Sequence, residues 1–108
     1  MLLVGHSYGG AVITEAGDLP NVTGLVYLAA LAPDAGESAG QASQEIPAAA
    51  ARNIAPDSDG YVWIRPDKFH ESVAQDLPAQ EALVMAVTQK APHGAVFGAA
   101  PSPPRRGA

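Results

Sequence analysis

The stretch LLVGHSYGGAV, residues 2–12, sets the strictest limit on what this chain can fold into, because two local patterns meet in it within a few residues. An apolar run, residues 2–4, stops at Gly5, and residues 9–16 then place apolar side chains on one helical stripe. The sequence therefore predicts a strand, a tight turn and a helix. Gly17 is predicted to end this helix in the left-handed conformation that glycine adopts easily.

A second apolar run, VTGLVYLAALA, follows the turn-forming residues DLPN. Its β-branched and aromatic side chains predict a strand over residues 23–31, buried on both faces of a parallel sheet. The two strands and the helix make a βαβ unit within residues 1–33, with the right-handed crossover usual for parallel strands. Two strands alone leave sheet edges without partners, so we expect this unit to belong to a larger sheet.

The rest of the chain is predicted to be loop and helix. Residues 34–60 show no sustained period and are expected to form a loop-like excursion, whereas residues 61–67 suit a short strand or hairpin arm. Residues 69–92 indicate two short helices that meet at Pro78. The inward stripe of the second helix is predicted to be Ala79, Leu83, Ala86 and Val87. Residues 93–108 are predicted to be a disordered tail, because Pro, Gly, Ala and Arg dominate its end.

Composition and charge exclude several classes of function. Eleven acidic residues against six basic ones give a formal net charge of −5, which argues against nucleic acid or a polybasic membrane surface as partner. The absence of cysteine excludes disulfides and thiolate chemistry, and the histidines and carboxylates lack metal-ligand spacing. No apolar run approaches the roughly 18 residues of a membrane span, and Met1 opens no signal-peptide pattern. We expect a cytoplasmic protein with no cofactor and a small-molecule partner.

The pentapeptide GHSYG, residues 5–9, has the Gly-X-Ser-X-Gly pattern of a strand that turns sharply into a helix. Such a turn strains the serine backbone and exposes its hydroxyl above the sheet, which makes Ser7 a candidate nucleophile. The backbone N–H of Tyr8, at the start of the helix, is then aimed at the oxyanion of a tetrahedral intermediate. The alternative is a small serine in an ordinary turn. A phosphate-binding loop is excluded because no Gly-Lys-Ser/Thr follows.

The glycines of this turn are predicted to allow close packing. Strand and helix approach so closely that a Cβ on Gly5 or Gly9 is expected to clash, and Gly10 is expected to let the helix sit tightly on the sheet. Gly5 and Gly9 are therefore predicted site residues together with Ser7 and Tyr8.

The segments LLVGHSYGGAVITEAG and NVTGLVYLAALAPDAGES resemble the turn, helix and next strand at the centre of the α/β-hydrolase superfamily. A strand closing in Ala-Ala-x-x-Pro-Asp is similar to the esterase and hydroxynitrile-lyase-like branch, and FHESVAQDLPAQEALVMAVTQ resembles its cap helices. The resemblance implies a partial α/β-hydrolase fold: a βαβ unit at residues 1–33, a mostly helical cap at 34–92 and a disordered tail at 93–108. It also implies that Ser7 is the nucleophile and that Tyr8 supplies one oxyanion amide.

Family members carry their acid and histidine on loops beyond the cap, and their second oxyanion amide precedes the serine. We therefore expect this chain to be a central fragment, incomplete and inactive by itself. Within the chain, the histidines that remain as candidate bases are His6, His70 and His93, and the best-placed acid is Asp34. Each also has a structural interpretation, which for Asp34 is a turn formed by APDAGES at the start of the cap.

Three functions stay open at the level of the sequence. The first is a carboxylesterase-like serine hydrolase that acts on a small ester through an acyl-enzyme, with lyase or haloperoxidase chemistry as variants on the same scaffold. The second is a non-catalytic member of the fold that binds a small molecule, and the third is a gene fragment with no independent function. Tyr61, Trp63 and Phe69 either line a substrate pocket or pack the cap. The sequence predicts no oligomeric state.

Overall fold

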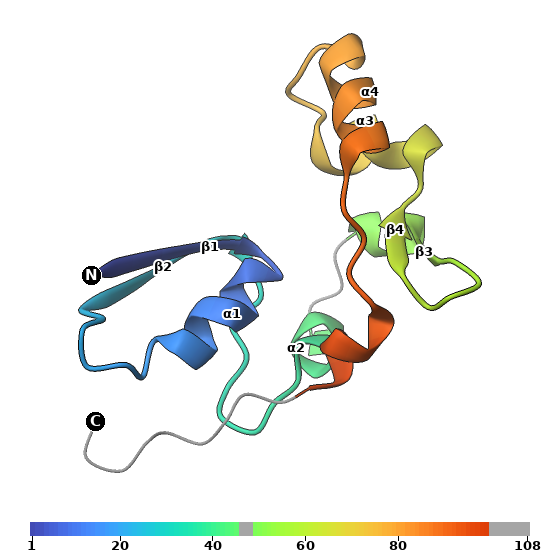
Figure 1. Ribbon diagram of the computed structural model, residues 1–108. Coiled ribbons are helices and arrows are strands. Elements are labelled where there is room, and N and C mark those ends of the chain that lie inside the picture. The colour runs from blue at the N-terminus through green and yellow to red at the C-terminus, as the bar shows by residue number, and fades with distance from the viewer. Residues whose placement is uncertain (46–48, 100–108) are drawn as a thin grey trace. The chain divides into compact units, whose positions relative to one another are not determined.

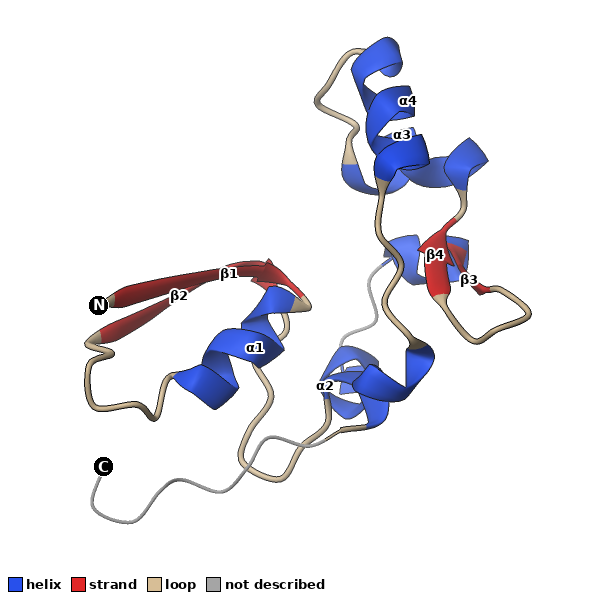
Figure 2. Cartoon of the chain, in the orientation of Figure 1, coloured by secondary structure: helices blue, strands red, loops and turns tan. Residues whose placement is uncertain are grey.

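The computed structural model describes residues 1–45 and 49–99, which form two compact units (Figures 1 and 2). The first unit contains β1 (Leu2–Ser7), α1 (Gly9–Ala16), β2 (Gly24–Ala30) and α2 (Ala39–Glu45), together with residues 97–99. The second contains the 3₁₀ helices η1 (Ala49–Asn53) and η2 (Pro66–Lys68), the strands β3 (Ile54–Pro56) and β4 (Val62–Ile64), and the helices α3 (Phe69–Val73) and α4 (Ala79–Thr88). A last 3₁₀ helix, η3 (Gly94–Gly98), leads from the second unit back to the first.

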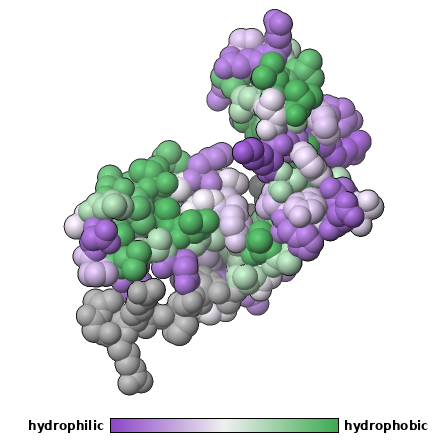
Figure 3. Space-filling view, in the orientation of Figure 1, coloured by the Kyte–Doolittle hydropathy of each residue, from purple (hydrophilic) through white to green (hydrophobic). Residues whose placement is uncertain are grey.

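The core of the first unit is the predicted βαβ unit. β1 and β2 pair in parallel, from Leu2 opposite Gly24 to His6 opposite Leu28, and α1 packs against both strands (Figure 1). The helix spans the predicted residues, and its Ile13 is buried. The predicted burial of the second strand on both faces was wrong, because the residues of β2 are half-buried or exposed. Figure 3 shows hydrophobic side chains gathered on the visible surface of this unit.

The pairing of the strands becomes irregular where β1 ends. His6 pairs with Leu28 but Ser7 pairs with Ala30, so that Ala29 is an extra residue of β2 without a partner in β1. Ser7 and Ala29 both have positive φ, 54° and 42°, a conformation that costs an L-residue about 1–2 kcal/mol. The end of the sheet therefore contains a β-bulge with one strained residue on each strand.

α1 approaches the strand ends most closely at two glycines. A Cβ on Gly5 would lie 2.6 Å from the carbonyl oxygen of Gly9, and a Cβ on Gly10 would overlap the carbonyl oxygen of Leu31 and lie 2.9 Å from the Cβ of Ala30. The predicted crowding is confirmed at Gly5 and Gly10. The same prediction for Gly9 was wrong, because a Cβ there would meet nothing within 4 Å.

Gly17 closes α1, but in a right-handed conformation with φ −64° rather than the predicted left-handed one. Its N–H donates a hydrogen bond of 2.7 Å to the carbonyl of Ile13. A Cβ on Gly17 would lie 2.8 Å from Cδ1 of Leu25. Glycine here fits the narrow space between α1 and β2, and its right-handed backbone is one that other residues also adopt.

The second unit combines a hairpin with two helices. β3 and β4 pair antiparallel, which confirms the predicted hairpin arm, and Pro78 directly precedes α4, as expected of two helices that meet there. Its core consists of Phe69, Ala74, Ala82 and Ala86, with Ile64 and Leu77 packed against them.

The predicted inward stripe of α4 was wrong except at Ala86. The face that meets the core carries the small side chains of Ala82 and Ala86, whereas Leu83 is 60% and Val87 69% exposed, and Ala79 is exposed as well. The space beside Phe69 is filled by alanines, so the spacing of the larger apolar residues indicated the wrong face.

Two segments predicted as irregular contain regular structure. Residues 34–60 include α2, where the hydroxyl of Ser38 accepts from the N–H of Gln41 at 3.1 Å and the Gln41 side-chain oxygen accepts from the N–H of Ser38 at 2.8 Å. This reciprocal pair is a capping box, a local helix-start signal that the sequence contained. The predicted tail was wrong over residues 94–98, which form η3. Residues 100–108 lie outside the described residues.

Asp57 organises the turn of the hairpin. Its Oδ1 accepts hydrogen bonds of 2.9 Å from the N–H groups of Asp59 and Tyr61. Its Oδ2 accepts one of 2.9 Å from the indole N–H of Trp63. The hydrogen bond from Trp63 is the main cause that holds the pKa of Asp57 below its ordinary value of 3.8; the backbone N–H groups act in the same direction and desolvation opposes them.

Replacing Gly10 by alanine should lower the free energy of unfolding by about 1–3 kcal/mol, because the added methyl group overlaps the backbone of Leu31. Gly9→Ala is the matched control: it places a methyl group in open space in the same helix and should leave stability unchanged or raise it by about 0.5–1 kcal/mol. Urea denaturation of both variants measures the difference. Equal effects would contradict the close approach described here.

The fluorescence of Trp63, the single tryptophan of the chain, should titrate with a midpoint below pH 3.8. Because the pKa of Asp57 is lowered in the folded chain, the stability that its carboxylate contributes is present above pH 3.8. This stability is lost as the pH falls through the lower folded-state pKa. The transition should be absent in Asp57→Asn and kept in Asp59→Asn, whose carboxylate does not accept the indole hydrogen bond. A midpoint above 3.8 would show that the indole bond does not control it.

Candidate active site

Ser7 is the last residue of β1 and lies directly before the helix α1. It is exposed, and its φ of 54° places it in the left-handed region. Its carbonyl oxygen accepts a hydrogen bond of 3.0 Å from the N–H of Leu31, which ties the turn to the chain after β2. A strained, exposed serine at a strand-to-helix turn has the backbone geometry that the nucleophile hypothesis requires.

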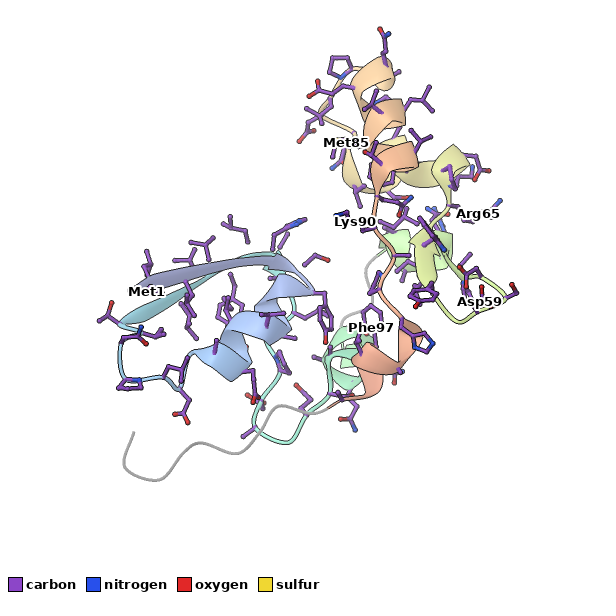
Figure 4. The ribbon with its side chains drawn as sticks, viewed as in Figure 1. Met1, Asp59, Arg65, Met85, Lys90 and Phe97 are labelled. Atoms are coloured by element: carbon purple, nitrogen blue, oxygen red, sulfur yellow. The ribbon has the colours of Figure 1, made fainter. Side chains whose placement is uncertain are left out.

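Tyr8 stands at the N-terminal end of α1, where the helix dipole stabilises a negatively charged oxygen. Its backbone is helical, with φ −59° and ψ −24°. Its ring packs edge-to-face on the ring of Phe97, with the ring centroids 5.3 Å apart and the planes at 70°. Phe97 is labelled in Figure 4. The residue that follows the candidate nucleophile is thus placed both by the helix and by an aromatic contact.

A hydroxyl pair fastens α1 to β2. The hydroxyl of Thr14 donates to the carbonyl of Gly10 at 2.7 Å, and the same oxygen lies 2.7 Å from the hydroxyl of Tyr27. Because the single proton of Thr14 is used by Gly10, Tyr27 is the donor in the second bond. The tie fixes the helix that carries Tyr8 relative to the strand that pairs with Ser7.

The histidines have separate environments. His6 is exposed beside the turn. In the second unit, Nε2 of His70 donates to the carbonyl of Leu77 at 2.8 Å, and Nδ1 of His93 accepts from the N–H of Ala95 at 3.1 Å. The ring of His93 also packs edge-to-face on Tyr61. Both rings therefore have structural roles within their unit.

The carboxylate candidate Asp34 lies in a turn. The N–H of Glu37 donates to the carbonyl of Asp34 at 2.9 Å, and the N–H of Asp34 donates to Oε1 of Glu37 at 3.1 Å. Gly36 within this turn has φ +81°. The geometry agrees with the structural interpretation of APDAGES as a turn. Among the described residues, Ser7 has no hydrogen bond to an imidazole, and Asp34 has none to His6.

Some aromatic residues pack the second unit, and one contacts the candidate site. Phe69 is buried in the core of the second unit, and Tyr61 and Trp63 are held at the hairpin by His93 and Asp57. Phe97, by contrast, contacts Tyr8 and was missed in the sequence analysis. No local signal marks it, because the contact joins the first residues of the unit to a distant part of the chain.

Within residues 1–45 and 49–99, no group of three His, Asp or Glu side chains is arranged to hold a metal ion. In the same residues, no helix has the length and apolar character needed to cross a membrane.

Comparison with known proteins places these observations in a family. A family model described as "Alpha/beta hydrolase family" matches residues 2–108. The chain belongs to the alpha/beta hydrolase family. It is also 52% identical over 40 residues to the carbendazim hydrolyzing esterase of Nocardioides sp. (strain SG-4G), a match that covers 35% of this chain and 16% of that relative. No solved structure matches. Membership confirms the fold class predicted from the sequence.

The strain at Ser7 predicts a difference between two variants of this alpha/beta hydrolase chain. Ser7→Gly should exceed Ser7→Ala in free energy of unfolding by about 1 kcal/mol, because glycine adopts positive φ freely while alanine keeps the Cβ penalty. Both variants lose the hydroxyl, so the comparison isolates the backbone. Equal stability in urea denaturation would mean that the turn carries no strain at this residue.

Proposed function

We propose that this chain carries the nucleophile and one oxyanion donor of an esterase-type serine hydrolase that acts on a small ester. The observation that carries the proposal is the exposed Ser7 at positive φ between β1 and α1 in a chain of the alpha/beta hydrolase family. The relative named as an esterase matches part of the chain and supports the same reaction class. The intact serine favours catalysis over binding alone.

In the proposed reaction, Oγ of Ser7 forms a bond to the ester carbonyl carbon while its proton passes to a base. The carbonyl oxygen becomes an oxyanion, which the N–H of Tyr8 stabilises at the start of α1. The tetrahedral intermediate collapses, the bond to the alcohol oxygen breaks, and the alcohol leaves with a proton. Water then attacks the acyl group on Ser7, and an acid is released.

The base must be an imidazole that contacts Ser7, and the described residues supply none in hydrogen-bond contact. We therefore propose that the chain by itself does not turn over esters. The chain supplies a positioned nucleophile and a positioned oxyanion donor, and turnover also requires a base.

An external base tests this directly. With p-nitrophenyl acetate in plain buffer, wild type and Ser7→Ala should release p-nitrophenol equally. Added imidazole should raise the wild-type rate above that of Ser7→Ala by about tenfold, a fraction of the ~10²–10⁴ that a positioned base contributes. Intact mass spectrometry should find acetyl on wild type only.

Two results would contradict the proposal in different ways. A Ser7-dependent burst without imidazole would show that the chain contains its own base, with His6 and His93 as the first to replace. Absence of acetylation at every imidazole concentration would show that Ser7 is not a nucleophile.

A further inference from the structure

We infer that Phe97 determines specificity at this site: its ring, packed on Tyr8, forms an apolar wall that receives the hydrocarbon chain of the ester held at Ser7. The inference deepens the proposed function and rests on it. Phe97 lies outside the Gly-X-Ser-X-Gly turn, and neither the motif nor the family match assigns it a role.

The position of Phe97 follows from its contact with Tyr8. Tyr8 directly follows Ser7 in the chain, and the centroid of its ring lies 5.3 Å from that of Phe97, edge-to-face. Both residues are half-buried, so neither is sealed inside the core of the unit. Two aromatic planes at 70° form a corner whose walls are carbon. We call this pair the aromatic corner.

The backbone of Phe97 is held independently of its ring. α2 passes so close that a Cβ on Gly40 would lie 2.9 Å from the carbonyl oxygen of Phe97. The neighbouring Ala39 is 1% exposed, so this part of α2 is well packed. Gly98, directly after Phe97, would place a Cβ in open space. Phe97 is therefore held from two sides, its ring by Tyr8 and its backbone by α2.

The chemistry of the aromatic corner selects an apolar group. Carbon surfaces that enclose an alkyl chain favour each buried methylene by about threefold to fourfold in affinity. An acetyl group is too short to gain much from such a wall, whereas a butyl or longer chain gains with each carbon. The site should thus prefer esters with an unbranched hydrocarbon arm over the shortest esters.

The test measures binding of straight-chain methyl ketones, from 2-butanone to 2-octanone, by solution NMR of the aromatic ring signals. Ketones resemble esters but have no leaving group, so the measurement requires no turnover and no base. In the wild-type chain, each added methylene should lower Kd by about threefold until the corner is filled. In Phe97→Ala this dependence on chain length should nearly vanish.

A second pair of variants leaves every aromatic ring in place. Gly40→Ala should displace Phe97 through its carbonyl and weaken the dependence on chain length, whereas Gly98→Ala should keep it, since its methyl group meets nothing. If the dependence is absent in the wild type, or persists unchanged in Phe97→Ala and Gly40→Ala, the inference is overturned while acetylation of Ser7 can still succeed. Failure of acetylation with a preserved chain-length dependence would instead remove the proposed function and leave the apolar wall.

Discussion

The close approach of α1 to the ends of β1 and β2 is the constraint on which the rest of the first unit depends. Only glycine at positions 5 and 10 lets the helix backbone lie against the strand ends, because a single methyl group at either place meets backbone atoms. With so little space, the chain must reverse from strand to helix within two residues. Ser7 takes the conformation that this reversal requires, and its hydroxyl is left exposed.

Backbone strain at the turn occurs on both strands of the sheet. Ser7 and Ala29 both adopt positive φ, at about 1–2 kcal/mol each, and the bulge at Ala29 lets the bond from Leu31 to the Ser7 carbonyl form beyond the irregular pair. Burial of Ile13, of the order of 1.5–3 kcal/mol, and the tie between α1 and β2 oppose this strain. The strain at the two residues and the stabilisation from packing are of similar size. The surrounding packing therefore holds the strained turn in place.

The sequence predicted those parts of the fold that local signals control. The helix over residues 9–16, the parallel strands and the crowding at Gly10 follow from apolar periodicity and glycine placement, which act over a few residues. The buried face of α4 did not, because alanines rather than the larger apolar residues meet Phe69. The contact of Phe97 with Tyr8 was beyond any local reading, since it depends on how distant segments return to the turn.

Geometry and activation are separable in a site of this kind. A serine hydroxyl is a weak nucleophile until a base takes its proton, whereas the backbone strain, the helix terminus and an apolar wall act on position alone. The first unit brings the positional elements together from separate parts of the chain: the turn holds Ser7, α1 holds Tyr8, and α2 supports Phe97. Because these elements pack on one another and not on a histidine, they form whether or not a base is present. In the proposed function, the unit therefore supplies position, and activation of the Ser7 hydroxyl requires a base.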